Sequence, residues 1–170
     1  MKILVCGGAG FIGSTFIRNF LRNNVDSKIT NLDALTIGSN LANLKDLENN
    51  QNYNFIKDDI RNDTQIDKLI KDTDLVVNFA AESHVDRSIA NPKPFIETNV
   101  LGTYTILEGI RKYDKHFIHV STDELYGDAG NQNSFNEKSI LKPSNPYSAT
   151  KAAADHLVGS YVRTYGVKCI

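Results

Sequence analysis

The chain has 170 residues, 41% of them hydrophobic, which is enough for one domain with a buried core. Its formal net charge of −1 provides no basic surface of the kind that binds nucleic acid or an anionic membrane. No apolar run reaches the roughly 18 residues of a membrane helix, and the N-terminus lacks the apolar core of a signal peptide, so we expect a cytoplasmic protein that binds a small molecule.

Short apolar runs alternate with amphipathic stretches along the chain. Continuous apolar runs are typical of parallel strands that are buried on both faces. The predicted strands are residues 3–6, 29–32, 53–56, 75–81, 117–120 and 167–170. The predicted helices are residues 11–22, 63–71, 94–113 and 146–165. This alternation predicts right-handed crossovers and an α/β fold with a doubly wound parallel sheet, in the strand order 3-2-1-4-5-6.

The first predicted strand ends in a glycine-rich turn. Gly7, Gly10 and Gly13 follow one another at intervals of three residues and open the first helix. Such a turn offers backbone N–H groups and the positive end of a helix to a pyrophosphate, and glycine allows close approach because it lacks a Cβ. The spacing is a variant of the usual Gly-x-Gly-x-x-Gly pattern, so the turn alone indicates either a nucleotide site or a flexible loop.

Acidic residues follow the second and third predicted strands. A carboxylate at Asp33 can accept hydrogen bonds from an adenosine ribose and would repel a 2′-phosphate, which favours NAD over NADP. The alternative for Asp33 is a turn or helix-capping residue. Asp59 and Ile60 can flank an adenine, or belong to a solvated charged turn. Between these strands, a short extra helix is predicted by the helical spacing of Leu41, Leu44 and Leu47.

The fifth predicted strand ends in a polar run, Ser121 to Glu124. The carboxyl ends of parallel strands line the ligand crevice of a doubly wound sheet, so this run belongs there. Asp123 and Glu124 can serve as acid and base if the site separates their pKa values. The alternative is that both are exposed loop charges.

Tyr147 and Lys151 stand four residues apart at the start of the last predicted helix, so both project from one face. A phenol has a pKa near 10, and a cation within about 4–6 Å lowers it by roughly 1–3 units. We expect Lys151, together with an oxidised nicotinamide, to make Tyr147 a usable base. The alternative is an ordinary surface pair.

The two cysteines and the end of the chain bear on its organisation. Cys6 and Cys169 lie in apolar runs, so we expect core thiols, with no disulfide and no metal site. The last four residues resemble a core strand that has just begun. We therefore expect residues 1–170 to be an NAD-binding domain at the front of a longer protein.

Longer motifs run through the whole chain: GGAGFIG, DDI, FAAESHVDRSI, FIETNVLGTY, VSTDELYGD and NPYSATKAAADHLV. Across them the chain resembles the extended short-chain dehydrogenase/reductase family, and within it the sugar-nucleotide 4,6-dehydratases. The resemblance implies a Rossmann fold, bound NAD and a nucleotide-sugar substrate, with dTDP-glucose expected although these residues do not fix the base. It also implies a homodimer formed through the helices at 94–113 and 146–165.

The resemblance implies roles for individual positions. It places the substrate sugar near Ser83 and Thr122. It places the cofactor against Gly7, Gly10, Phe11, Ile12, Gly13, Asp33, Ala34, Leu35, Thr36, Asp59, Ile60, Phe79, Ala80, Ala81, Thr98, Tyr147 and Lys151.

The implied reaction begins when Tyr147, assisted by Lys151, removes the C4 hydroxyl proton while the C4 hydride is transferred. Glu124 then takes the C5 proton, Asp123 protonates the departing C6 hydroxyl, and the hydride returns to C6, with Thr122 near C4. Two alternatives remain. A C4 epimerase would use Tyr147 and NAD but leave both carboxylates without a role, and a chain that truly ended at residue 170 would be a non-catalytic NAD-binding fragment.

Overall fold

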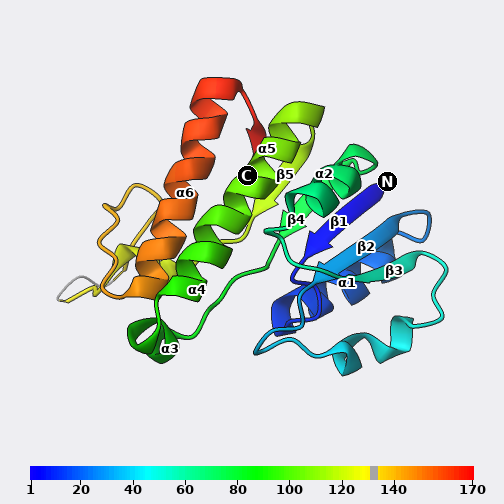
Figure 1. Ribbon diagram of the computed structural model, residues 1–170, viewed down its shortest axis with the longest axis horizontal. Coiled ribbons are helices and arrows are strands. Elements are labelled where there is room, and N and C mark those ends of the chain that lie inside the picture. Colours follow the sequence, from blue (N-terminus) through cyan, green and yellow to red (C-terminus); the bar gives the residue numbers. More distant parts are fainter. Residues whose placement is uncertain (131–133) are drawn as a thin grey trace.

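The centre of the molecule is a six-stranded parallel sheet in the order β3-β2-β1-β4-β5-β6, which confirms the predicted order (Figure 1). The computed structural model describes residues 1–130 and 134–170. The strands are β1 (Lys2–Cys6), β2 (Lys28–Asp33), β3 (Tyr53–Lys57), β4 (Leu75–Asn78), β5 (His116–His119) and β6 (Lys168–Cys169).

Helices connect the strands. The α-helices are α1 (Phe11–Asn23), α2 (Asp63–Lys71), α3 (Val85–Ala90), α4 (Lys93–Phe95), α5 (Thr103–Tyr113) and α6 (Pro146–Tyr165). The 3₁₀ segments are η1 (Leu41–Leu47) and η3 (Asp123–Tyr126), and η2 (Ile96–Gly102) is a π-helix. The helix predicted over 94–113 is thus a run of α4, η2 and α5. The short helix predicted around Leu44 is η1. No helix in the described ranges has both the length and the apolarity needed to cross a membrane.

Both faces of the sheet are packed, as continuous apolar strands require. Consecutive strand residues point to opposite faces. Leu4 and Cys6 pack in one core with side chains of α2, α5 and α6, whereas Ile3 and Val5 pack in the other with α1 and η1. Within the described chain both cysteines are free; Cys6 is fully buried, and its burial raises the pKa of the thiol to about 12.

The strand predicted over 75–81 ends earlier, at Asn78. The last bond to β1 is from Phe79 N to Cys6 O at 2.8 Å; the chain then leaves the sheet, and Ala80 N donates to the Asn78 side chain at 3.1 Å. This bend brings the Ala80 backbone against Gly7, where a Cβ would lie 2.5 Å from Ala80 N. The end of the predicted strand therefore becomes a wall next to the glycine turn.

In-register parallel strands bring their following loops to one edge. Cys6 of β1 pairs with Leu32 of β2 and with Asn78 of β4. The glycine turn, Asp33 and residues 79–83 consequently meet at this edge, where the segment after β5 and the start of α6 also lie (Figure 1).

Candidate functional site

A pocket of about 340 Å³ opens at the carboxyl edge of the sheet. Four predicted site residues do not line it: Leu35, Thr122, Asp123 and Glu124. The predicted residues that do are Gly7, Gly10, Phe11, Ile12, Gly13, Asp33, Ala34, Thr36, Asp59, Ile60, Phe79, Ala80, Ala81, Ser83, Thr98, Tyr147 and Lys151.

The three glycines of the turn meet different surroundings. Gly7 has φ +77°, a left-handed conformation, and lies against the Ala80 backbone. At Gly13 a Cβ would overlap the Gly7 carbonyl oxygen, whereas at Gly10 the nearest atom to a Cβ is 3.4 Å away. In the described chain no side chain caps α1, so its first N–H groups are available to an anion at the pocket.

Asp33 is buried, and both of its carboxylate oxygens accept backbone hydrogen bonds. Ala9 N donates to Oδ2 at 2.9 Å, and Leu35 N donates to Oδ1 at 2.8 Å. Leu35 has φ 55°, a left-handed conformation that a side chain rarely adopts. Asp33 is therefore a turn residue, as one of the two interpretations of the sequence predicted. It also lines the pocket, where its oxygens have lone pairs left to accept from a further donor.

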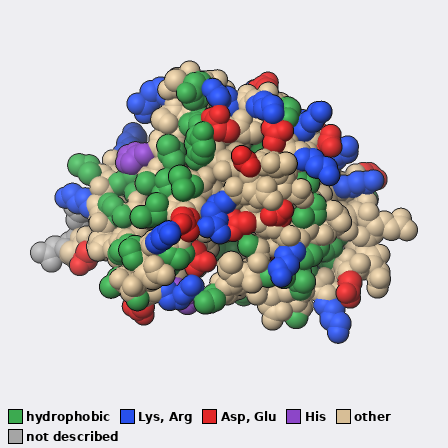
Figure 2. All heavy atoms as spheres, in the orientation of Figure 1, with side chains coloured by type: hydrophobic (Ala, Val, Ile, Leu, Met, Phe, Trp, Pro, Cys, Tyr) green, Lys and Arg blue, Asp and Glu red, His purple; other side chains and the backbone are tan. Residues whose placement is uncertain are grey.

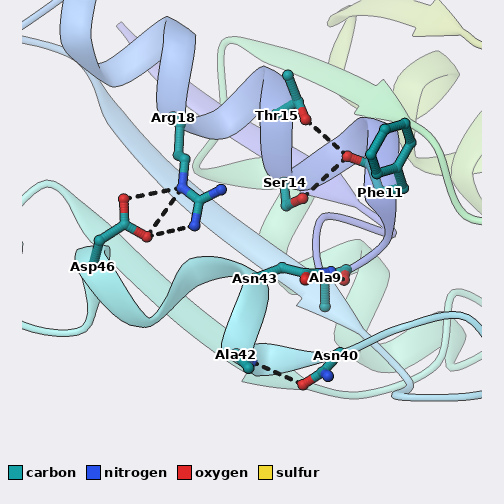
Figure 3. A network of polar contacts seen from close by, with 9 residues as sticks. All are labelled: Ala9, Phe11, Ser14, Thr15, Arg18, Asn40, Ala42, Asn43 and Asp46. Carbon is teal, nitrogen blue, oxygen red and sulfur yellow. Dashed lines mark hydrogen bonds and ion pairs between the residues drawn. The ribbon is translucent and has the colours of Figure 1, made fainter.

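The segment that begins η1 is fixed to the glycine turn and to α1 (Figure 3). Asn40 N and Asn43 Nδ2 both donate to the Ala9 carbonyl oxygen, each at 3.0 Å. Asp46 pairs with Arg18 of α1 through three contacts of 2.7 to 3.0 Å. The pocket-lining loop after Asp33 is thus anchored at both ends.

Tyr147 and Lys151 are buried, so the surface-pair alternative is wrong. Lys151 is only 4% exposed. Its Nζ donates a hydrogen bond to the Val120 carbonyl oxygen at 2.6 Å. Burial lowers the pKa of Lys151 to about 8, while the nearby Asp155 carboxylate acts in the opposite direction.

The pKa of Tyr147 is raised above its ordinary value; the lowering that we expect from Lys151 together with an oxidised nicotinamide stays a prediction. Burial is the largest cause; a hydrogen bond with Thr122 lowers the pKa, and the carboxylates of Glu124 and Asp123 raise it further. Burial and these two negative charges therefore outweigh the lowering by the Thr122 hydrogen bond. The same contacts show that the phenol shares its surroundings with the polar run after β5.

That polar run lies beside the pocket lining. Thr122 caps η3, with Glu124 N donating to its Oγ1 at 3.3 Å, and Asp123 and Glu124 are exposed. Asn145 Nδ2 donates to Glu124 Oε2 at 3.2 Å. Because Asn145 is also the N-cap of α6, the Glu124 carboxylate is tied to the helix turn that presents Tyr147.

Sequence reasoning missed Asn99, which connects three parts of the site. Its Oδ1 accepts from Glu82 N at 2.8 Å, and its Nδ2 donates to Glu82 O and to Thr150 Oγ1, both at 3.0 Å. It lies in the π-helix η2 beside the pocket residue Thr98, and π segments are frequent at functional sites. Asn99 thereby joins the wall after β4 to the helix of Tyr147.

Ser121, which we expected at this edge with the polar run, also lines the pocket, and the lining residues absent from the predicted set are Leu32, Ile37, Gly38, Ser39, Asp58 and Val120. Most are neighbours of predicted positions, and that adjacency is the signal that would have found them. Val120 could not have been found in this way. It accepts the Lys151 hydrogen bond through its backbone carbonyl, and a pattern of side-chain types does not predict a backbone contact.

Comparison with known proteins gives consistent relatives. A family model described as GDP-mannose 4,6 dehydratase matches residues 4–170. The chain is 46% identical over 170 residues to dTDP-glucose 4,6-dehydratase of Mycobacterium tuberculosis, covering 99% of this chain and 51% of the relative. The chain thus spans about half the length of the curated relatives it matches.

Solved structures show the same likeness. The dTDP-glucose 4,6-dehydratase DesIV from Streptomyces venezuelae, solved with NAD bound, superposes with a TM-score of 0.95 at 42% identity, over 99% of this chain and 54% of that one. A UDP-glucose 4-epimerase from Thermus thermophilus, also solved with NAD, gives a TM-score of 0.87 at 29% identity, over 99% and 53% of the two chains.

Proposed function

This chain belongs to the GDP-mannose 4,6 dehydratase family, and from that membership we propose that it forms the cofactor-binding and catalytic part of an NAD-dependent sugar-nucleotide 4,6-dehydratase. The observation that supports this best is that Glu124 accepts a hydrogen bond from Asn145, the N-cap of the helix that carries Tyr147, and that Thr122, Asp123 and Glu124 all influence the pKa of the phenol. One cluster then contains both the base for an oxidation and the acid–base pair for an elimination. The names of the relatives favour dTDP-glucose as the substrate.

The pocket fits NAD. Gly10 leaves room for a pyrophosphate at the uncapped start of α1, and Asp33 offers its remaining lone pairs to a ribose diol while opposing a 2′-phosphate. The proposed contacts include Asp59 and Ile60 near the adenine, and Lys151 beside Tyr147 at the other end. NAD, when bound, supplies a hydride acceptor that later gives the hydride back.

The proposed chemistry of the chain's own residues has two stages. Tyr147 takes the C4 hydroxyl proton as C4 becomes a ketone, and that ketone makes the C5 proton acidic. Glu124 takes the C5 proton and Asp123 gives a proton to the C6 hydroxyl, which leaves as water. The hydride and a proton are then added at C6 and C5, so the net reaction is loss of water with no net redox change.

An epimerase is the second candidate, because it would use the same phenol and cofactor. It gives no role to the Asp123 and Glu124 carboxylates, which lie beside Tyr147. The epimerase structure is also less similar to this chain than the dehydratase structure. We therefore place it second.

The test uses the intact protein and dTDP-glucose labelled with deuterium at C4, with the product analysed by NMR. We expect the label at C6, the 4-keto-6-deoxy sugar, and in heavy water deuterium at C5. A galacto epimer with its label still at C4 would establish the epimerase and contradict our proposal. UDP-glucose offered in parallel tests the choice of base.

Variants separate the two stages. Tyr147→Phe is expected to abolish label transfer, whereas Tyr161→Phe, the same change on the same helix at a residue that bonds Glu108, is the matched control. Glu124→Gln should slow loss of water by about 10²- to 10⁴-fold while C4 oxidation continues. Equal loss of both stages in Glu124→Gln would contradict its assignment as the C5 base.

We also propose a homodimer formed by the outer faces of η2, α5 and α6. Figure 2 shows hydrophobic side chains gathered over the region where α5 and α6 lie in Figure 1. The exposed apolar side chains of these elements include Leu101, Tyr104, Val162 and Tyr165. A cytoplasmic location stays a prediction.

A further inference from the structure

A partly buried polar cluster lies behind Lys151, and the proposed mechanism does not use it. The His119 side chain at the end of β5 is 4% exposed, and its Nε2 lies 3.6 Å from Asp155 Oδ1. Across residues 1–130 and 134–170, neither ring nitrogen of His119 nor Asp155 Oδ1 has a hydrogen-bond partner. Buried polar atoms are normally paired, so these three call for a functional explanation.

The position of Asp155 connects this cluster to the catalytic helix. Asp155 follows Lys151 by four residues on α6, so the two side chains lie on one face. Lys151 Nζ donates to Val120 O, which belongs to the residue directly after His119. Lys151 therefore lines the pocket and also influences the pKa values of His119 and Asp155.

The charges around Asp155 have a definite arrangement. The titratable groups that face it are Lys151 and His156 on α6, His119 on β5 and Cys169 on β6. Burial lowers the pKa of His119 to about 3, with the Lys151 cation contributing, so this ring is neutral. Burial raises the pKa of Asp155, while Ser121, Lys151 and His156 act against that rise.

We propose that Asp155 is a positioning residue for Lys151: its carboxylate is the counter-charge that keeps the amine an ammonium directed at the Val120 carbonyl. His119 supports this arrangement. Because its ring is neutral, it does not form an ion pair with Asp155, and the carboxylate remains the counter-charge of Lys151. Since burial alone favours the neutral amine, loss of the carboxylate leaves Lys151 a weaker donor at neutral pH.

The test measures the protonation of Lys151 directly, by NMR titration of the intact protein labelled with carbon-13 at lysine Cε. We expect Asp155→Asn to lower the Lys151 pKa by about one unit from its value of about 8, and Asp155→Glu to restore it. Asp114→Asn is the matched control, because Asp114 is an exposed carboxylate that pairs with Lys168 away from the pocket. An unchanged Lys151 pKa in folded Asp155→Asn would overturn the proposal.

A second measurement needs no substitution and covers the case in which Asp155→Asn does not fold. In the unmodified protein the Lys151 resonance should show an additional acid inflection at the pKa of Asp155, above the ordinary value of a carboxyl group. A single inflection, from Lys151 itself, would refute the coupling.

The catalytic meaning of this cluster rests on the proposed function, and activity assays keep the two apart. With dTDP-glucose, the alkaline limb of the kcat profile should move to lower pH by about one unit in Asp155→Asn, following the lysine. If the alkaline limb of the kcat profile does not move in Asp155→Asn although the Lys151 pKa falls, the role of Asp155 in catalysis is overturned. Absence of any turnover in the unmodified protein would count against the proposed function, and the titration would still decide the positioning role.

Discussion

The glycines of the turn have two different roles: Gly13 allows close packing of the backbone, and Gly10 leaves space for a ligand. A Cβ at Gly13 would overlap backbone atoms of Gly7 and Gly8, whereas one at Gly10 has its nearest neighbour at 3.4 Å. We expect Gly13→Ala to lower the free energy of unfolding by about 1–3 kcal/mol. Gly10→Ala should leave it within about 0.5 kcal/mol but weaken NAD binding, because the methyl group occupies the approach of the pyrophosphate.

Urea unfolding and calorimetric titration with NAD measure these two effects separately. Gly10 has φ −73° and ψ 174°, which alanine adopts without strain, so its variant serves as the matched control for stability. Tight NAD binding by a stable Gly10→Ala protein would show that the cofactor does not approach this turn.

His119 should make the protein sensitive to acid. Its pKa is about 3 in the folded protein and near 6.5 when unfolded, so between these values only the unfolded chain takes up the proton. Stability is therefore fully present above about pH 6.5 and is lost as the pH falls. Between about pH 7 and about pH 5 this amounts to at most about 2 kcal/mol.

Replacement of His119 by phenylalanine removes this titration and keeps an aromatic ring next to Phe117. Urea unfolding at several pH values should give a shallower acid slope for His119→Phe than for the unmodified protein. Parallel slopes would mean that His119 takes up a proton in the folded state. A change in packing caused by the substitution alters the stability equally at every pH, so it does not affect the slopes that are compared.

At the scale of elements, Asn99 should matter more than any surface contact of its helix. Asn99→Ala removes three hydrogen bonds and leaves the Glu82 backbone groups and the Thr150 hydroxyl short of a partner. We expect a loss of about 3 kcal/mol in the free energy of unfolding. Thr150→Val removes one of these three bonds and the bond from Thr150 Oγ1 to Tyr147 O, so about 2 kcal/mol is expected, and thermal or urea unfolding checks both variants. Equal losses would contradict this graded role.

The apolar pattern predicted the strands and their order because buried parallel strands need continuous apolar runs and their crossovers have one hand. It failed at residues 79–81, which are apolar yet lie beyond the end of β4 and line the pocket. Neither the helix α3 nor the π-helix η2, whose Asn99 bonds residues distant in sequence, was predicted. Such features arise from tertiary contacts, which local periodicity does not encode.

The candidate site was predictable where a side-chain type at a fixed spacing has a chemical purpose, as with Asp33, Tyr147 and Lys151. All three line the pocket. Val120 acts through its backbone, and Asn99 acts through residues far away in sequence, so neither leaves a pattern. The spacing of Tyr147 and Lys151 could not predict that burial raises the pKa of the phenol, or that Glu124 and Asp123 raise it further.

For the whole molecule, the proposed dimer can be tested at Leu101. This side chain is 52% exposed, so it is not part of the core, and Leu101→Glu should leave the free energy of unfolding of one subunit nearly unchanged. We expect analytical ultracentrifugation of the intact variant to show monomers where the unmodified protein gives dimers. Val25→Glu, another exposed apolar position, is the matched control. A dimeric Leu101→Glu protein would place the interface elsewhere.

The two backbone bonds of Asp33 limit how this pocket could evolve or be redesigned. Acceptance of a 2′-phosphorylated dinucleotide would require loss of the Asp33 charge. The same carboxylate accepts hydrogen bonds from Ala9 N and from Leu35 N, where the backbone is left-handed, so a single neutral replacement would also leave at least one of these donors without its acceptor and loosen the loop. Cofactor preference and loop shape therefore depend on the same side chain. A change of preference would need a replacement of the whole segment from Asp33 to Asn40, and a point substitution would not suffice.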